Sequence, residues 1–164
     1  MTKEYRHIPV LLSECIEALH LSEGQTYVDA TLGGAGHSLE VAKHIGRTGH
    51  LIGIDQDAVA RKAARERLEA LPEAIRPEID VVEGNFGDLD ALLVAAQIPS
   101  IDAILFDLGV SSVQIDTPAR GFSFKETGPL DMRMDPSNQT LTAAEIINTY
   151  NAADLLSLIH ISEP

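Results

Sequence analysis

The sequence predicts an α/β fold in which a parallel sheet of about four strands alternates with helices. Short, apolar, β-branched segments recur along the chain, and segments with helical spacing separate them. This alternation is typical of a parallel sheet with right-handed crossovers. The composition is globular, with 45% hydrophobic and 23% charged residues, and a length of 164 residues allows one ordinary domain.

The four predicted strands are residues 26–30, 50–54, 79–82 and 103–108. The predicted helices are residues 11–19, 38–45, 58–71 and 89–96. Gly46 is the expected C-terminal cap of the second helix. Asp57 is a good N-cap for the third helix, and Pro72 ends it.

The organisation of the chain changes after residue 110. From residue 111 to about residue 140 the periodicity disappears, which is typical of a functional or a disordered segment. Residues 141–158 return to helical spacing. Residues 156–164 read like a translated transposon end, and we expect this tail to be non-native.

Composition argues against several classes of protein. No stretch approaches the roughly 18 apolar residues of a membrane span, and the N-terminal apolar run is too short for a secretion signal. The single cysteine, Cys15, fits a reducing compartment, so we expect a cytoplasmic protein. No metal site is predicted. The net charge of −13 by itself disfavours nucleic-acid binding, which needs Lys and Arg against phosphates.

A glycine-rich bend follows the first strand and runs into a helix, with the sequence Asp29-Ala-Thr-Leu-Gly33-Gly34-Ala35-Gly36-His37-Ser38. Glycines let the backbone approach a ligand closely, and a helix N-terminus offers unpaired N–H groups. The bend therefore predicts a site for a polar ligand. The alternative is a glycine-rich turn without a ligand.

The kind of ligand depends on the residues around the bend. The dinucleotide pattern G-x-G-x-x-G is not met, because Leu39 stands where the third glycine belongs, and no P-loop lysine follows. Asp29 would repel a pyrophosphate and suits the ammonium of a methionine moiety. Charge therefore favours S-adenosylmethionine over NAD.

Polar and aromatic residues at later strand ends fit a nucleoside. Asp55 ends the second strand, where a carboxylate can accept both ribose hydroxyls, although such residues also cap helices. Phe86 follows the third strand and can cover an adenine face, or it is a core aromatic. The fourth strand leads into Asp107-Leu-Gly-Val-Ser111-Ser112-Val-Gln114 at the carboxyl edge of the sheet, where open α/β folds bind ligands.

Several motifs together resemble one family. They are His7-x-Pro9-Val-Leu-Leu, Asp29-x-Thr31-x-Gly33-x-x-Gly36-His37-Ser38, IDQD, DLGVSS with Gln114, Arg120-Gly-Phe-Ser-Phe124 and Pro129-Leu-Asp-Met-Arg-Met-Asp135. Over about residues 5–151 the chain is similar to the 16S ribosomal RNA cytosine-N4 methyltransferases, known as RsmH or MraW. The resemblance implies a Rossmann-like class I methyltransferase fold dependent on S-adenosylmethionine. The sheet would be incomplete at the C-terminus, with the missing strands downstream of Asn151.

The resemblance also implies functional residues. The cofactor contacts would be Ala35, Gly36, His37, Asp55, Phe86, Asp107 and Gln114. Alanine stands at position 35 where glycine is expected, and it still permits a backbone contact. Residues 1–110 would be the S-adenosylmethionine-binding core, and residues 111–155 would begin a helical RNA-recognition insertion.

The implied reaction is methylation of a cytosine N4 in 16S ribosomal RNA of the small subunit. Because the lone pair of this amine is delocalised into the ring, the enzyme must accept its hydrogen bonds and align it with the methyl group. Asp107, Ser111 and Ser112 are the candidate catalytic residues, although the serines can also merely cap a turn.

Other interpretations stay open. Arg120 and Arg133 either contact RNA or pair with neighbouring acids. The negative charge would be explained if the basic RNA-facing surface lay downstream. An NAD-type Rossmann oxidoreductase and a non-catalytic cofactor-binding or interaction module are the competing functions.

Overall fold

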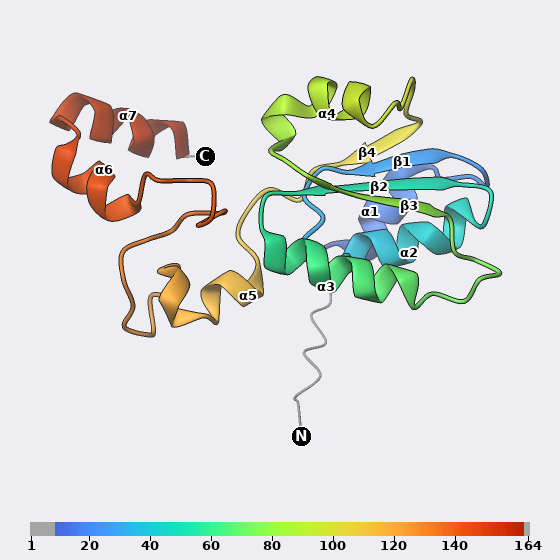
Figure 1. Ribbon diagram of the computed structural model, residues 1–164, viewed down its shortest axis with the longest axis horizontal. Coiled ribbons are helices and arrows are strands. Elements are labelled where there is room, and N and C mark those ends of the chain that lie inside the picture. Colours follow the sequence, from blue (N-terminus) through green and yellow to red (C-terminus); the bar gives the residue numbers. More distant parts are fainter. Residues whose placement is uncertain (1–8, 163–164) are drawn as a thin grey trace. The chain divides into compact units, whose positions relative to one another are not determined.

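The computed structural model describes residues 9–162, and the chain divides into two compact units between Gly109 and Val110 (Figure 1). His7, the first residue of one motif, lies outside the described residues. The last two residues of the tail 156–164 also lie outside them. In the described part of the chain, no helix is long and apolar enough to cross a membrane.

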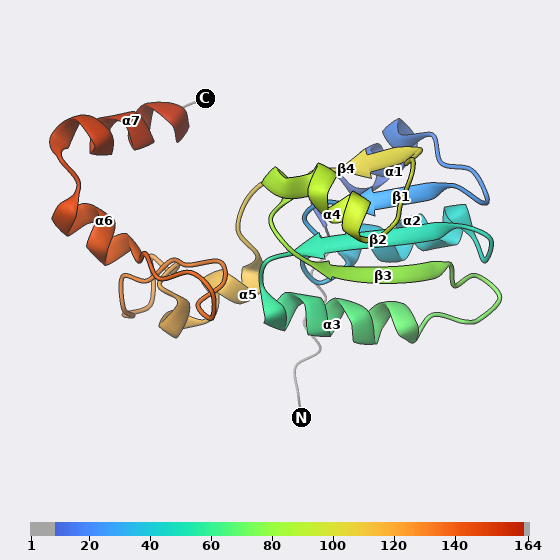
Figure 2. The same ribbon diagram turned by 45° about the horizontal axis from the view of Figure 1, so that its top comes forward.

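The first unit contains the predicted parallel sheet. Its strands are β1 (Thr26–Asp29), β2 (His50–Asp55), β3 (Glu78–Glu83) and β4 (Ala103–Leu105). They lie in the order β3-β2-β1-β4, and every pair is parallel (Figure 2). The prediction of four parallel strands is confirmed.

β4 is shorter than predicted, because it ends at Leu105 instead of residue 108. Leu105 pairs with Asp29, the last residue of β1, so the strand it pairs with ends there. Leu108 is 69% exposed. Residues 106–108 therefore lie at the carboxyl edge of the sheet and not within it.

The helices of the first unit are α1 (Leu12–Leu19), α2 (Gly36–Ile45), α3 (Ala58–Glu69), the 3₁₀ turn η1 (Phe86–Asp88) and α4 (Leu89–Ala95). The four predicted helices are confirmed, with α2 beginning earlier than expected. Asp57 caps α3 as predicted, since its Oδ1 accepts a hydrogen bond of 2.9 Å from the N–H of Val59. Gly46 caps the end of α2 with a φ of 64°.

The core of the first unit lies on both faces of the sheet. Neighbouring strand residues point to opposite faces, so Tyr27 and Val28 belong to different apolar clusters. α2 and α3 cover one face and α4 covers the other (Figure 1). Both faces are closed, which leaves the carboxyl ends of the strands as the place where polar residues gather.

The second unit is built from short helices and a hydrogen-bonded loop. Its elements are α5 (Ser112–Ile115), the 3₁₀ turn η2 (Pro118–Arg120), α6 (Ala143–Thr149) and α7 (Ala152–Ser162). The helical spacing predicted for residues 141–158 is confirmed, but the run forms two helices. Thr142 and Glu145 form a capping box at the start of α6, and the Asn151 side chain accepts the N–H of Ala153 at 2.9 Å to cap α7. These two start signals divide the run.

The segment between η2 and α6 has little regular structure, but it is ordered by close backbone contacts. A Cβ added to Gly121 would meet the carbonyl oxygen of Pro129, and one added to Gly128 would meet that of Pro118. Gly121 also has a φ of 78°, which favours glycine. Two backbone crossings therefore depend on these glycines.

Candidate functional site

The glycine-rich bend is tied to the carboxyl end of β2. The N–H of Leu32 donates to the carbonyl of Ile54 at 3.0 Å, and the N–H of Gly33 donates to Oδ2 of Asp55 at 2.8 Å. The Leu32 side chain packs over Gly53, where an added Cβ would come within 2.6 Å of it. Gly53 therefore admits the bend against the sheet.

The end of the bend has little room for side chains. Ala35 is fully buried and left-handed, with a φ of 60°, a conformation that glycine adopts more easily. A Cβ on Gly36 would meet the ring of Pro9. His37 is only 6% exposed. At Ala35, Gly36 and His37, the three implied cofactor contacts in the bend, a ligand would therefore meet mainly backbone atoms.

Asp29, which its charge suggests for the methionine end of the cofactor, is buried beneath the bend. It is 2% exposed, and its carboxylate accepts hydrogen bonds from the Ser38 hydroxyl at 2.6 Å and from the Thr31 N–H at 3.2 Å. Burial raises the pKa of Asp29 to about 6, while these two hydrogen bonds act in the opposite direction. Through these two hydrogen bonds, Asp29 links Ser38 of α2 to Thr31 at the start of the bend.

Asp55 is partly exposed at the end of β2. Its Oδ2 accepts the Gly33 N–H and its Oδ1 accepts the Asp57 N–H, both at 2.8 Å. Burial raises the pKa of Asp55, and the two backbone donors lower it. A carboxylate has about four lone-pair sites, so each oxygen can still accept one further hydrogen bond.

Two arginines of α3 hold the backbone around this carboxylate, and the sequence interpretation missed them. Arg61 donates to the carbonyls of Asp55 at 3.0 Å and Gln56 at 2.8 Å. Arg67 donates to the carbonyl of Gly34 in the bend. In the sequence both look like ordinary charges on a helix, and only the tertiary contact distinguishes them.

Two phenylalanines meet at the same edge of the sheet. Phe86 begins η1 after β3, and Phe106 follows β4. Their ring centroids lie 5.8 Å apart with the planes at 86°, and the two residues are 39% and 43% exposed. The sequence pointed to Phe86 alone, because Phe106 reads as part of the fourth strand.

Asp107 is placed at the end of β4 and is open to solvent. Its side chain is 57% exposed, and its N–H donates to the Thr31 hydroxyl at 2.7 Å. The Nδ1 atom of His37 lies 3.8 Å from Oδ2 of Asp107, and the Nε2 atom lies 3.3 Å from the Val10 carbonyl. Thr31 therefore holds the backbone of Asp107 next to the glycine bend, and His37 borders its exposed carboxylate.

The other predicted site residues belong to the second unit. Ser111 is the N-cap of α5, where its hydroxyl accepts the Gln114 N–H at 3.2 Å. The Gln114 side chain accepts the Ser111 N–H at 2.9 Å and directs its amide nitrogen at the Met134 sulfur, and it is 5% exposed. Ser112 is the first residue of the same helix. These contacts match the capping alternative for Ser111.

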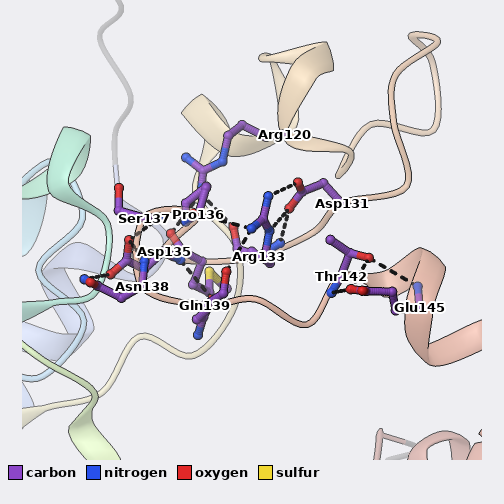
Figure 3. Close-up of polar contacts among 11 residues, drawn as sticks. Arg120, Asp131, Arg133, Asp135, Pro136, Ser137, Asn138, Gln139, Thr142 and Glu145 are labelled. Carbon is purple, nitrogen blue, oxygen red and sulfur yellow. Dashed lines mark hydrogen bonds and ion pairs between the residues drawn. The ribbon is translucent and has the colours of Figure 1, made fainter.

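The two arginines of the second unit are engaged within it (Figure 3). Arg133 binds the Asp131 carboxylate through Nε at 2.8 Å and Nη2 at 2.6 Å, and it also donates to the Gln139 carbonyl at 2.8 Å. The Arg133 contacts lower the pKa of Asp131 to about 2. Arg120 donates to the carbonyls of Arg133 and Met134, each at 3.0 Å. For Arg133, the interpretation as a partner of a neighbouring acid is confirmed, and Arg120 binds backbone carbonyls.

Comparison with known proteins decides the family. A family model described as the MraW methylase family matches residues 4–162. The chain belongs to the MraW methylase family. Ribosomal RNA small subunit methyltransferase H of Mycoplasma mycoides is 49% identical over 154 residues, which are 94% of this chain and 48% of that protein. Ribosomal RNA small subunit methyltransferase H 2 of Agathobacter rectalis is 49% identical over 157 residues, which are 95% and 48%.

This chain of the MraW methylase family spans about half the length of the curated relatives it matches. Among solved structures, a crystal structure of a Clostridium thermocellum protein has a TM-score of 0.50 at 22% identity, over 61% of this chain and 51% of that one. That likeness shows the fold. The predicted Rossmann-like methyltransferase fold and the resemblance to the family are confirmed.

Proposed function

We propose that this chain is the cofactor-binding part of an S-adenosylmethionine-dependent methyltransferase that methylates the N4 of a cytosine in 16S ribosomal RNA of the small subunit. The observation that carries the proposal is the contact between Gly33 and Asp55, which places a carboxylate with free acceptor sites beside a glycine bend. Membership of a methylase family supports the same assignment.

The residues at the carboxyl edge fit a nucleoside. Asp55 receives the two ribose hydroxyls on the lone pairs that Gly33 and Asp57 leave open. Phe86, with its ring partly exposed, covers the adenine. The backbone of residues 34–37 borders the methionine end, because the side chains of Ala35 and His37 are buried. S-adenosylmethionine supplies the methyl group when bound.

Asp107 is the residue that receives the target amine. Its exposed carboxylate accepts a hydrogen bond from the cytosine N4 group and so orients the amine towards the methyl donor. Thr31 holds the Asp107 backbone and His37 borders its carboxylate, so the residue that carries the acceptor is held at the strand end before the RNA arrives. Ser111, Ser112 and Gln114 remain candidates for the catalytic and cofactor roles that the resemblance implies.

Binding of a nucleic-acid substrate requires basic surface, and the net charge of −13 disfavours it in this chain by itself. The curated relatives are about twice as long, which leaves room for such a surface in the whole protein. Names of relatives at 49% identity support small-subunit ribosomal RNA as the substrate. The cytosine N4 position rests on the motif resemblance.

Two experiments test the proposal. Isothermal calorimetry compares S-adenosylmethionine with NAD, and only the former is expected to bind. A protein of the relatives' length that contains this chain is then incubated with tritiated cofactor and small-subunit RNA, and nuclease digestion is expected to release labelled N4-methylcytidine. If the protein is an enzyme, Asp107→Ala should abolish labelling. If it is a non-catalytic module, even the unaltered protein should give no labelling, and Asp107→Ala should leave binding to its partner unchanged.

A further inference from the structure

The phenylalanine pair joins opposite edges of the sheet. Phe86 follows β3 and Phe106 follows β4, and these are the two outer strands in the order β3-β2-β1-β4. Their ring centroids lie 5.8 Å apart, so the pair connects the carboxyl ends of the two outer strands. Asp55 ends β2 at that edge, and Asp107 directly follows Phe106.

Neither phenylalanine belongs to the buried core. The apolar cluster on the α4 face consists of Val28, Ile52 and Ile54, and residues of β3, β4 and α4 pack against it without either phenylalanine. Both residues are about two fifths exposed. Large apolar surface at a polar edge is typical of a ligand-binding position.

We infer that Phe106 is a positioning residue that fixes the ring of Phe86 against the nucleobase of the cofactor. Nothing in the sequence motifs assigns a role to Phe106, and the inference rests on the proposed function. An edge-to-face contact sets the relative orientation of two aromatic planes. Whichever ring presents its edge, Phe106 leaves at least one face of Phe86 uncovered, and Phe86 is 39% exposed.

The contact matters because, without it, the partly exposed side chain of Phe86 can adopt several rotamers. With Phe106 in place, Phe86 holds one orientation before the ligand binds, so less conformational entropy is lost on binding. Asp55 holds the ribose, which brings the base towards this ring. Phe106 therefore affects binding of the nucleoside part of the cofactor and not binding of its methionine part.

A double-mutant cycle in calorimetry tests the coupling. The ligands are S-adenosylmethionine and 5′-methylthioadenosine, which keeps the nucleoside and lacks the amino acid. Phe106→Leu is expected to raise Kd about three- to tenfold for both ligands. Phe106→Tyr keeps an aromatic ring and should give the Kd of the unaltered protein. In the double variant with Phe86→Leu, the loss should equal that of Phe86→Leu alone, because Phe106 acts through Phe86.

A matched control and a second measurement separate positioning from folding. Phe124→Leu is the same change at a fully exposed phenylalanine of the second unit, and it should leave both affinities unchanged. The chain contains no tryptophan, so Phe86→Trp introduces a single indole, which is excited selectively at a longer wavelength than the three tyrosines. Adding Phe106→Leu to that variant should lower the fluorescence anisotropy of the free protein, because the indole gains mobility.

The outcomes discriminate between the two proposals. Unchanged affinities for Phe106→Leu, additive losses in the double variant, or unchanged anisotropy overturn the role of Phe106 alone. If the unaltered chain binds neither ligand, the proposed function is overturned and this inference with it. Coupled losses for both ligands, with rescue by tyrosine, support it.

Discussion

The N–H of Gly33 donates to Oδ2 of Asp55 across 2.8 Å, from the bend after β1 to the end of the neighbouring β2. This bond makes the glycine bend and the acidic residue one unit. The same carboxylate accepts the N–H of Asp57 through its other oxygen, so its orientation is fixed on both sides. A ligand that binds Asp55 therefore meets the bend as well.

Replacing Asp55 by asparagine should weaken S-adenosylmethionine binding by about 10- to 100-fold, because charged hydrogen bonds to the ribose are lost. Asp57→Asn is the matched control. It makes the same chemical change two residues later, and asparagine is as good an N-cap as aspartate, so affinity should persist. Calorimetry on both variants gives the comparison, and equal affinities would contradict the role of Asp55.

Asp29 should make the stability of the protein fall as the pH rises. Its pKa in the folded chain is raised to about 6, so folding favours the protonated form. The stabilisation is present in full below the ordinary pKa of 3.8 and is lost as the pH passes through 6. Relative to Asp29→Asn, the protein should lose on the order of 3 kcal/mol between pH 4 and pH 7.

Urea unfolding at several pH values measures this difference. Asparagine can still accept the Thr31 N–H, and the Ser38 hydroxyl can turn to accept from the amide. If the unfolding free energies of the unaltered protein and of Asp29→Asn change in parallel across this pH range, the pKa of Asp29 is not raised in the folded protein.

Gly53→Ala should destabilise the first unit by about 1–3 kcal/mol and weaken cofactor binding. The added methyl group would come within 2.6 Å of the Leu32 side chain, so the start of the bend must move. Leu32→Ala makes room for it. The double variant is therefore expected to lose less stability than the sum of both single changes, and strict additivity in chemical denaturation would rule out this contact.

Gln97→Gly should stabilise the protein by about 1 kcal/mol. Gln97 follows α4 with a φ of 60°, in a motif where the N–H of Ile98 donates to the Leu93 carbonyl at 2.9 Å. The side chain is exposed, so little packing is lost. Gln97→Ala keeps the Cβ and should give no gain, and an equal gain from both changes in thermal melting would refute the explanation.

Much of the fold could be predicted from the sequence because local signals agree with it. The apolar strands, the Asp57 cap and the Gly46 cap each need only neighbouring residues. The extent of β4 could not be predicted, since it depends on where β1 stops pairing. The division between α6 and α7 has a local cause in Thr142 and Asn151, which the apolar spacing of the run concealed.

The candidate site was predictable only where strand ends determine it. Parallel strands bring their carboxyl ends to one edge, so Asp55 and Asp107 were expected together there. The burial of Asp29 depends on a hydroxyl presented by α2, and the contact of Phe86 with Phe106 joins two outer strands. Such contacts are tertiary, and neither charge nor spacing reveals them.

A crystal structure of the chain with S-adenosylmethionine would show whether Asp55 binds the ribose. We expect both ribose hydroxyls within about 3 Å of the Asp55 carboxylate and the methionine end along the backbone of residues 34–37. A cofactor bound elsewhere on the chain, or a ribose that makes no hydrogen bond to Asp55, would contradict it.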